Sequence, residues 1–460
     1  MSEPETNKIE AVVLAGELKD KFNSNTPHLL HTLTGQPVIH FAVNSVREAV
    51  GDLPLLVLSD DSEEINRQTE GLIKEIIYVE QGNDAFMLGK IAGLLTGDTA
   101  VILIVPANMP LLTSNTLEQL ISTHLSNTGS SIPISILTYL SSTEDGNNYV
   151  VRDEFGAITN VSHSPKINSK LSNYELDTGV YCISSEWLMQ VISRIHDSQS
   201  NEFHLNDLIE FAKADDLTVQ DVQLINQEEA LRIETRFHLA EAERIIRQRV
   251  LRNLMVAGVT IIDPNTTYID AQVEIGSDTV IHPNTYLYGS TKIGTQCSIG
   301  PNCLIKDTSV GDRCEITFSV AESAMLEDDV DIGPFAHLRK GAHLARGVHM
   351  GNYGEVKNSY LGPGTKMGHF SYIGDATIGP GVNIGAGVIT ANYDGKNKHA
   401  TEIGAGAFIG SDTMLVAPVK IGAGARTGAG SVVTKDVPPN SLAVGIPARV
   451  IRKVEEKDGS

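Results

Sequence analysis

Aliphatic residues recur at steps of six along the C-terminal part of the chain, beyond Pro264. The steps run through three sets, which are Ile275, Ile281, Leu287, Ile293, Ile299 and Ile305, then Ile332, Leu338, Leu344 and Met350, then Ile403, Ile409, Leu415 and Ile421 with Val433 two steps later. A period of six fits neither a helix nor a single strand. It fits a triangular coil in which each of three short strands points one aliphatic side chain inward. The pattern predicts a parallel β-helix of hexapeptide repeats, of the left-handed type, over residues 257–460.

The N-terminal part of the chain alternates apolar runs with a helical pattern. The runs EAVVLAG, LPLLVLSD, AVILIVPA and ELDTGVYCI predict buried strands, and SNTLEQLISTHL has the apolar spacing of an amphipathic helix. This alternation predicts an α/β, Rossmann-like domain with a largely parallel sheet over residues 1–226. Ligands of such sheets bind at the carboxyl ends of the strands, here near Gly16 and Asn108.

A third pattern connects these two parts. Residues 227–256 contain no proline and carry Ala, Leu, Ile, Glu and Arg in a helical rhythm. They predict one long linker helix between the domains.

Composition and charge narrow the classes of function. The 57 acidic residues outnumber the 35 basic ones, for a net charge of -22, which argues against nucleic acids and anionic membranes as partners. The chain has no apolar stretch that could cross a membrane and no secretory signal pattern, so we expect a cytoplasmic protein without membrane insertion. Four cysteines form no disulfide framework. Cys297 and Cys303, six residues apart, are expected to stack as packed thiols in adjacent coils.

Polar residues between Ile332 and Ser411 offer candidates for acyl transfer to an amine. His369 lies where polar residues interrupt the repeat, and imidazole is the side chain best suited to general-base catalysis near neutral pH. Arg339 and Lys357 could hold a phosphate. Taken alone, each of these three residues is more often an ordinary solvated or packed residue. The insertion TANYDGKNKHATE leaves the six-residue register for about two coils, which favours a loop of a functional site.

The motifs of this region carry a resemblance to a known family. IGPFAHLRKGA, HMGNYGEVKNS, GHFSYIGDATIG, VNIGAGVITANYDGKNKH and FIGSDTMLVAPV follow its acetyltransferase motifs in order. Over nearly all 460 residues the chain resembles the bifunctional N-acetylglucosamine-1-phosphate uridylyltransferase / glucosamine-1-phosphate N-acetyltransferase family of bacterial cell-wall precursor synthesis. The resemblance implies a homotrimer with sites between neighbouring prisms, acetyl-CoA as co-substrate and an amino sugar phosphate as acceptor, although another amino sugar phosphate is not ruled out.

The resemblance also implies roles for individual residues. It makes His369 the general base and assigns the sugar phosphate to Arg339 and Lys357. The residues that it places around the sugar are Tyr372, Asn383 and Lys398. The residues that it places along acetyl-CoA are Ala386, Asn392, Tyr393, Ser411 and Ala429. The family's basic residue after the last coil aligns near Ile446, so Arg449 is the candidate substitute for contact with the CoA phosphates.

The N-terminal domain resembles the nucleotidyltransferase half of the family, but its site residues differ. The phosphate-binding loop reads LAGELKDKF, with Glu17, Asp20 and Lys21 in place of Gly, Thr and Arg, and His28 replaces a lysine. Asn83 and Asp84 replace the uracil-contacting Gly and Thr, and Asn108 replaces a metal-binding Asp. His163 and Asp177 stand at the family's sugar-contacting Glu and Asn positions, and Glu234 aligns with its second metal ligand, normally Asn. These changes predict that uridylyl transfer is lost and that Mg²⁺ has no function in this domain.

Three other interpretations remain open. The chain could be a fully bifunctional enzyme, or a non-catalytic regulatory or structural trimer. It could also resemble the γ-type carbonic anhydrases, because His337, His343 and His349 lie at steps of six and would form a ladder on one face. Such a ladder stacks parallel rings in one protomer and does not converge on a metal, so we expect no metal site.

Overall fold

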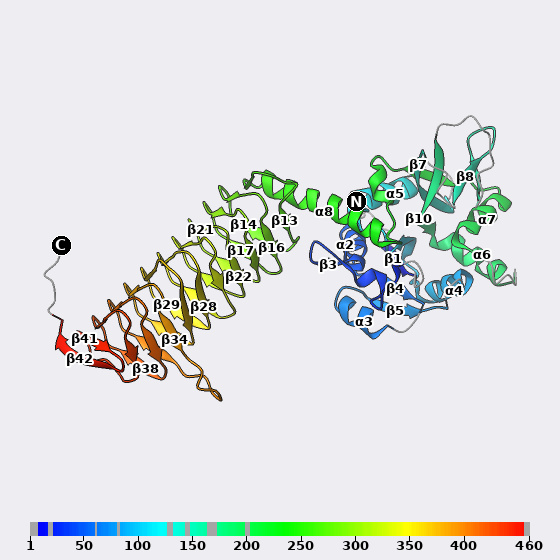
Figure 1. The fold of residues 1–460 in the computed structure, drawn as a ribbon. Helices are drawn as coiled ribbons and strands as arrows, with labels where there is room; N and C mark the ends of the chain where they lie inside the picture. Colours follow the sequence, from blue (N-terminus) through cyan, green and yellow to red (C-terminus); the bar gives the residue numbers. More distant parts are fainter. Residues whose placement is uncertain are drawn as a thin grey trace, which may run out of the picture. The chain divides into compact units, whose positions relative to one another are not determined.

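The chain forms two compact units, Met1–Ile246 and Arg247–Ser460 (Figure 1). The computed structural model describes residues 8–16, 22–59, 62–80, 83–126, 132–142, 148–162, 173–197 and 203–454. Glu17, Asp20, Lys21 and His163, which the sequence marks as changed site positions, lie outside the described residues.

The first unit is an α/β domain, which confirms the expected fold class. Its sheet has the order β11-β7-β10-β6-β1-β4-β5, with bounds Gln220–Gln223, Ile134–Ser141, Tyr174–Ser184, Thr99–Pro106, Lys8–Ala15, Leu55–Leu58 and Glu75–Tyr78. β1, β4, β5 and β6 are parallel, whereas β10 runs antiparallel to β6 and β7. Two strands extend the sheet, β8 (Tyr149–Arg152) and β9 (Ile158–Ser162). A small hairpin is made by β2 (Thr32–Leu33) and β3 (Gln36–Pro37).

Helices pack on this sheet where the sequence pattern predicts amphipathic segments. α5 (Ser114–Leu125) is the expected SNTLEQLISTHL helix, and Thr113 caps its first turn through the Thr116 N–H. The other helical segments are η1 (His28–Leu30), α2 (Val38–Val50), α3 (Glu63–Thr69), α4 (Asp84–Leu94), α6 (Ser185–Asp197), η2 (Leu205–Asp207) and α7 (Leu208–Ala214). Among the described residues, none of the helices combines the length and the apolar character that crossing a membrane requires.

The expected linker helix is shorter than the sequence indicates. Residues Gln227–Ala230 form a 3-10 turn, η3, and the helix α8 runs only from Arg236 to Val256. The reason is a tertiary contact: the buried Glu229 carboxylate accepts hydrogen bonds from Thr113 N at 3.0 Å and Thr116 Oγ1 at 2.8 Å. This contact fastens the segment to the start of α5, and it overrides the helical propensity of the local sequence.

The second unit is a three-sided prism of short parallel strands, as the six-residue period predicts (Figure 1). Face 1 consists of β12 (Thr260–Ile261), β15 (Val280–Ile281), β18 (Ser298–Ile299), β21 (Glu315–Ile316), β24 (Asp331–Ile332), β27 (His349–Met350), β30 (Lys366–Met367), β33 (Asn383–Ile384), β36 (Phe408–Ile409), β39 (Arg426–Thr427), β41 (Ser441–Gly445) and β42 (Ala448–Lys453). Face 2 consists of β13 (Tyr268–Ile269), β16 (Tyr286–Tyr288), β19 (Leu304–Lys306), β22 (Val320–Glu322), β25 (His337–Leu338), β28 (Gly354–Lys357), β31 (Ser371–Gly374), β34 (Ile389–Ala391), β37 (Met414–Val416) and β40 (Val432–Val433). Face 3 consists of β14 (Glu274–Ile275), β17 (Lys292–Ile293), β20 (Ser309–Val310), β23 (Met325–Leu326), β26 (Ala342–Leu344), β29 (Ser359–Leu361), β32 (Ala376–Ile378), β35 (Thr401–Ile403) and β38 (Val419–Ile421).

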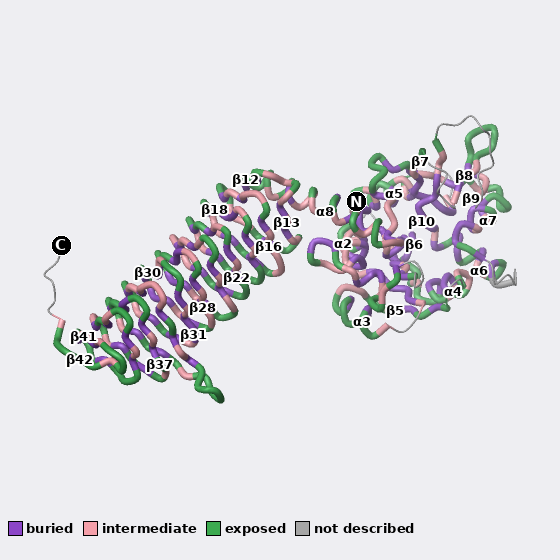
Figure 2. Tube along the Cα trace, viewed as in Figure 1, coloured by how far each residue is buried: buried purple, intermediate pink, exposed green. Residues whose placement is uncertain are grey.

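The inward aliphatic residues stack coil upon coil and form the core of the prism (Figure 2). Ile281 lies opposite Ile299 on face 1, Leu287 opposite Ile305 on face 2, and Ile293 opposite Val310 on face 3. Because each coil buries its apolar side chains on its neighbours, the core is continuous along the prism. We call the turns from face 1 to face 2 edge 1–2, and name edge 2–3 and edge 3–1 in the same way.

The arrangement corrects two expectations that rested on steps of six. A step of six moves to the next face, and the same face is reached again only after a whole coil. His337, His343 and His349 therefore lie on three different faces and do not form a ladder; each contacts its own carboxylate, on Glu322, Glu327 and Asp331 respectively.

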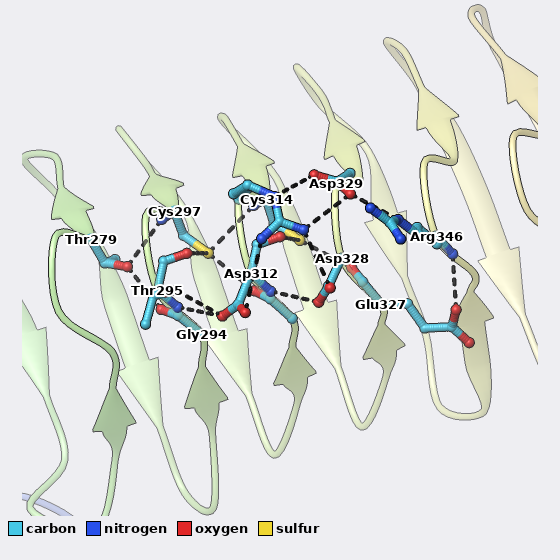
Figure 3. Close-up of polar contacts among 12 residues, drawn as sticks. Thr279, Gly294, Thr295, Cys297, Asp312, Cys314, Glu327, Asp328, Asp329 and Arg346 are labelled. Carbon is cyan, nitrogen blue, oxygen red and sulfur yellow. Dashed lines mark hydrogen bonds and ion pairs between the residues drawn. The ribbon is translucent and has the colours of Figure 1, made fainter.

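The cysteines follow the same rule. Cys297 does not stack on Cys303; its in-line neighbour is Cys314, whose backbone N–H lies 3.4 Å from the Cys297 Sγ (Figure 3). All four cysteines are buried and free.

Carboxylates link successive turns of edge 3–1, where Cys297 and Cys314 also lie. Asp312 accepts a hydrogen bond from Thr295 N at 2.7 Å, and Asp328 accepts one from Asp312 N at 3.0 Å.

The polar stretches leave the coil register intact, contrary to expectation. His369 lies in an ordinary turn between β30 and β31, with no interruption of the coil. The insertion occupies only residues 392–400, between β34 and β35 of one coil, and not two coils. An antiparallel bridge between Tyr393 and Lys398 closes it into a finger, orange in Figure 1.

Candidate active site

Four of the predicted residues occupy equivalent turns on edge 1–2. His369, Ala386, Ser411 and Ala429 lie in the turns that lead from β30 to β31, β33 to β34, β36 to β37 and β39 to β40. The turns are joined by backbone hydrogen bonds, including Asp412 N to Ala386 O at 2.6 Å and Gly430 N to Ser411 O at 2.8 Å. The structure thus gathers four residues that are scattered over the sequence into one row that runs along the prism.

Glycine residues allow the backbones of successive turns to pack directly against one another. A Cβ built on Gly385 would lie 2.6 Å from the Ser411 N, and one on Gly410 would lie 2.8 Å from the Ala429 N. Neither approach is tolerable for a real Cβ, so a side chain at either position would force the coils apart. The row is therefore narrow, and His369 stands at one end of it as its only titratable member.

Arg449 lies at the opposite end of this row. It faces Val444 in the antiparallel pair β41–β42, and the Val444 side chain covers Gly428, the residue before Ala429. The guanidinium is exposed and donates only to the neighbouring Ala448 carbonyl among the contacts of the described residues, at 2.9 Å. Its position is consistent with the expected contact to the far end of a long ligand.

A second group of predicted residues gathers on edge 2–3. Arg339 follows β25, Lys357 ends β28, and Lys398 projects from the finger of the next coils. The neighbouring Lys398 lowers the pKa of Lys357, and Arg339 adds to this effect. The Arg339 Nη1 also donates to the Glu355 Oε1 at 2.8 Å. Three neighbouring cations form an environment suited to a phosphate.

Asp375 links this group to the finger, and the sequence analysis missed it. Its carboxylate accepts hydrogen bonds from Asn358 Nδ2 at 2.6 Å and from Asn392 Nδ2. Partial burial acts to raise the pKa of Asp375, but the two amide donors and the charges of Lys398 and Lys357 hold it below its ordinary value. Each partner is 17 residues away, which is one coil, and that spacing was the available signal.

Tyr372 and Asn383 lie in strands beside these edges. Tyr372 points outward from β31, with Ser371 and Ile373 buried on either side, and its hydroxyl lies over Gly374, where a Cβ would collide with it. Asn383 points outward from β33 on face 1, directly before the row of turns. In the finger, Asn392 is buried, whereas Tyr393 is exposed and donates its hydroxyl to the Gly395 carbonyl at 2.8 Å.

Within one chain the two groups remain apart. Lys357 is in register with Gly374, the last residue of β31, whereas His369 precedes the first residue of that strand. The whole of β31 therefore separates the imidazole from the cations. A single prism presents the two halves of the predicted site on two different edges.

Exposed aromatic residues continue edge 1–2 beyond His369. Phe318, Phe335, Tyr353 and Phe370 occupy the corresponding turns of four coils, and all four are exposed. The Phe335 and Tyr353 rings are stacked with centroids 5.3 Å apart, and Phe318 follows at 5.8 Å from Phe335. The four rings form a contiguous apolar strip beside the row of turns, and strips of this kind are typical of surfaces that contact another protein.

The first unit has a cavity at the carboxyl ends of β1 and β6, beside the middle of the antiparallel strand β10. It has a volume of about 380 Å³, and Asp84, Asn108 and Glu234 are among its lining residues. His28 directly precedes the lining residue Leu29, and burial lowers the pKa of His28 to about 4, so the residue that replaces the family's lysine is uncharged at neutral pH. Asp177 is buried and holds the Tyr181 hydroxyl, and burial raises the pKa of Asp177. Asn83 caps α4 through the Phe86 N–H.

Asn108 and Glu234 face the same cavity as close neighbours. The Ile233 N–H donates to the Asn108 carbonyl at 2.8 Å, which places Glu234 beside Asn108. The family has a carboxylate and an amide at these two positions, and this chain has an amide and a carboxylate. The oxygen donors suited to a divalent cation are thus exchanged in position rather than simply removed.

Comparison with known proteins agrees with both units. The family model of the bacterial transferase hexapeptide, with six repeats, matches residues 272–307 and 400–435. The chain is 38% identical over 436 residues to the bifunctional protein GlmU of Geobacillus sp. (strain WCH70), covering 94% of each chain. It is 37% identical over 457 residues to that of Thermotoga petrophila, covering 97% of this chain and 98% of the relative. A CMP:2-keto-3-deoxy-manno-octonic acid synthetase complexed with CTP aligns over 53% of the chain at 12% identity, with a TM-score of only 0.42. On the two full-length matches, this chain belongs to the family of bifunctional GlmU proteins.

Proposed function

We propose that the chain transfers the acetyl group of acetyl-CoA to the amine of glucosamine 1-phosphate, giving N-acetylglucosamine 1-phosphate for cell-wall precursor synthesis in the cytoplasm. The observation that carries the proposal is the row of small turns on edge 1–2 that leads to His369. A long thioester can lie along that row, with Ala386, Ser411 and Ala429 beside it and Arg449 near its phosphates. Asn392 and Tyr393 belong to the finger on edge 2–3, so a neighbouring chain would bring them to the thioester.

The proposed reaction gives each residue a defined role. His369 takes a proton from the amino group, whose lone pair then attacks the thioester carbonyl and forms a C–N bond. Collapse of the tetrahedral intermediate breaks the C–S bond, and CoA leaves as the thiol after it takes up the proton that His369 accepted. Arg339 and Lys357 hold the sugar phosphate, and Tyr372, Asn383 and Lys398 orient the ring so that the amine meets the carbonyl.

We further infer that the active form is a homotrimer whose sites combine edges of neighbouring prisms. The imidazole and the cations lie on opposite sides of β31 in one chain, so a second chain would bring the missing half. The exposed aromatic strip on edge 1–2 supports such contact, because apolar rings gain from being covered.

We propose that uridylyl transfer is lost and that Mg²⁺ has no function in the first unit. The uncharged His28 and the carboxylate of Asp84 make a poor environment for a triphosphate. Full bifunctionality is the second candidate, because Asn108 and Glu234 still offer an amide and a carboxylate to a metal and because the relatives are named bifunctional.

Two assays on one preparation test these proposals. Thiol release from acetyl-CoA with glucosamine 1-phosphate is expected in the parent and is expected to fall at least 100-fold in His369→Ala. Formation of UDP-N-acetylglucosamine from UTP with Mg²⁺ is expected to stay at background. Absence of thiol release in the parent would favour a non-catalytic trimer, and robust uridylyl transfer would establish the second candidate.

A further inference from the structure

The cavity of the first unit is rich in hydrogen-bond acceptors. Its lining combines the apolar residues Leu14, Leu29 and Pro106 with several amide and carboxylate side chains. Asn206 also lines the cavity with only 8% of its surface exposed, and its Oδ1 has no hydrogen-bond partner among the residues that the structure describes. A buried acceptor without a donor is unfavourable, so a ligand that brings an O–H or N–H group into the cavity would gain affinity.

The charges of the described lining residues disfavour an anion. Asp84 and Glu234 face the cavity, and Asp84 is held at the first turn of α4 by accepting the Leu205 N–H at 3.0 Å. The one guanidinium, Arg232, donates its Nη2 to the Thr178 carbonyl. It packs against Gly179, where φ is +73° and a Cβ would collide with it. Arg232 is therefore held by these contacts, and the carboxylates of Asp84 and Glu234 would repel a phosphate.

We propose that this cavity binds an unphosphorylated sugar, a free hexose or hexosamine, and not a nucleoside triphosphate. Sugar hydroxyls both donate and accept, so they can satisfy the Asn206 Oδ1 and the Asp84 carboxylate, whereas a fully ionised phosphate has no donor. The apolar lining residues suit the face of a sugar ring, and a cavity of about 380 Å³ lies in the range of small-molecule sites. This site is independent of the acetyl-transfer site of the second unit.

Three ligands that share a hexose ring but differ in net charge test the proposal. Binding of glucose, glucosamine and glucose 1-phosphate to the full-length protein is measured by titration calorimetry and by saturation-transfer NMR. Asn206→Leu removes the unpartnered acceptor at similar volume, so the part of the binding that this variant abolishes belongs to the cavity. We expect glucose and glucosamine to bind the parent and to lose at least tenfold in affinity in Asn206→Leu. Glucose 1-phosphate is expected to bind both proteins alike, through the second unit.

Two further variants keep the test interpretable. Asn66→Leu, in α3 and outside the cavity, is the matched control and is expected to bind all three ligands like the parent. Asp84→Asn retains an acceptor for the Leu205 N–H and is expected to weaken glucosamine more than glucose. The proposal is overturned if glucose and glucosamine bind parent and Asn206→Leu equally or not at all. It is also overturned if UTP with Mg²⁺ or glucose 1-phosphate is the ligand that Asn206→Leu loses.

Discussion

Asp375 accepts a hydrogen bond from the Asn392 side chain of the next coil, and this contact ties the finger to the cation group on edge 2–3. The same carboxylate lies close enough to Lys357 and Lys398 for their charges to lower its pKa. One side chain therefore positions residues that we assign to two different substrates.

We expect Asp375→Asn to raise the KM of glucosamine 1-phosphate and of acetyl-CoA together, each about tenfold, with a smaller change in kcat. The amide cannot hold the Asn392 amide and balance two ammonium groups at once, and a tenfold loss corresponds to about 1.4 kcal/mol. Steady-state kinetics with each substrate varied in turn measures the effect. Asp329→Asn, whose carboxylate pairs with Arg313 and Arg346 on edge 3–1, is the matched control. A change in neither KM would remove Asp375 from the site.

Mixed oligomers are expected to restore activity if each site combines two chains. His369→Ala damages edge 1–2 and Lys357→Met damages edge 2–3. An interface between edge 2–3 of the first variant and edge 1–2 of the second would therefore form a complete site. We expect co-expressed, differently tagged variants to show at least ten times the thiol release of either variant alone. Lys357→Met combined with Arg339→Met serves as the control, because both changes lie on the same edge. Equal activity in the two mixtures would mean that each chain carries its own site.

The aromatic strip predicts where the oligomer can be weakened. Phe335 is 53% exposed in the single chain, stacks on Tyr353 and meets Phe318 at a tilt. Phe335→Ser is expected to cost about 1–3 kcal/mol of association free energy per interface. Light scattering over a dilution series would then show a smaller mass at low protein concentration. Phe155→Ser, which removes an 88% exposed ring of the first unit, should leave the mass unchanged. Identical dilution curves for both variants would place the interface elsewhere.

Buried histidines predict acid sensitivity of the first unit. Burial lowers the pKa of His28 and of His124 to about 4, whereas an unfolded histidine titrates near 6.5. Between these values the unfolded chain binds more protons, so stability is fully present above about pH 6.5 and falls as the pH drops toward 4, by about 3 kcal/mol for each imidazole.

Thermal unfolding at pH 7 and pH 5 measures this loss. Replacing both residues, as His28→Gln with His124→Gln, is expected to reduce the difference in Tm between the two pH values. His40→Gln, which removes a ring that contacts only the Gln68 carbonyl among the polar contacts of the described residues, should keep the parent's difference. An unchanged pH dependence in the double variant would assign the acid sensitivity to other groups.

The sequence predicts the prism well because each side of a coil needs one inward aliphatic residue, and that need repeats every six positions. The same reasoning fails for relations between coils. His337 and His343 are neighbours in the six-residue pattern but lie on different faces, whereas Asn358 and Asp375 meet although 17 residues separate them. The six-residue step from one face to the next is visible in a short stretch of sequence. Contacts between neighbouring coils depend on the length of each coil, which varies and must be known before their side chains can be aligned.

The rest of the site depends on tertiary contacts that local patterns do not show. The start of α8 is set by Glu229 and its contacts with Thr113 and Thr116, so helical propensity alone places it too early. The separation of His369 from Lys357 depends on which strand lies between them. The sequence indicates which residues belong to the site, and the fold decides which of them one chain can bring together.

The glycine-lined turns of edge 1–2 also fix a length. From the turn of His369 to that of Ala429 there are three coil intervals, each about 4.8 Å, so the two residues lie roughly 14 Å apart along the prism. Because backbone rests on backbone, this separation cannot relax by side-chain movement, and evolution can change it only by adding or deleting an entire coil. On our proposal that acetyl-CoA lies along this row, the fixed spacing would select acyl carriers by the length of their arm.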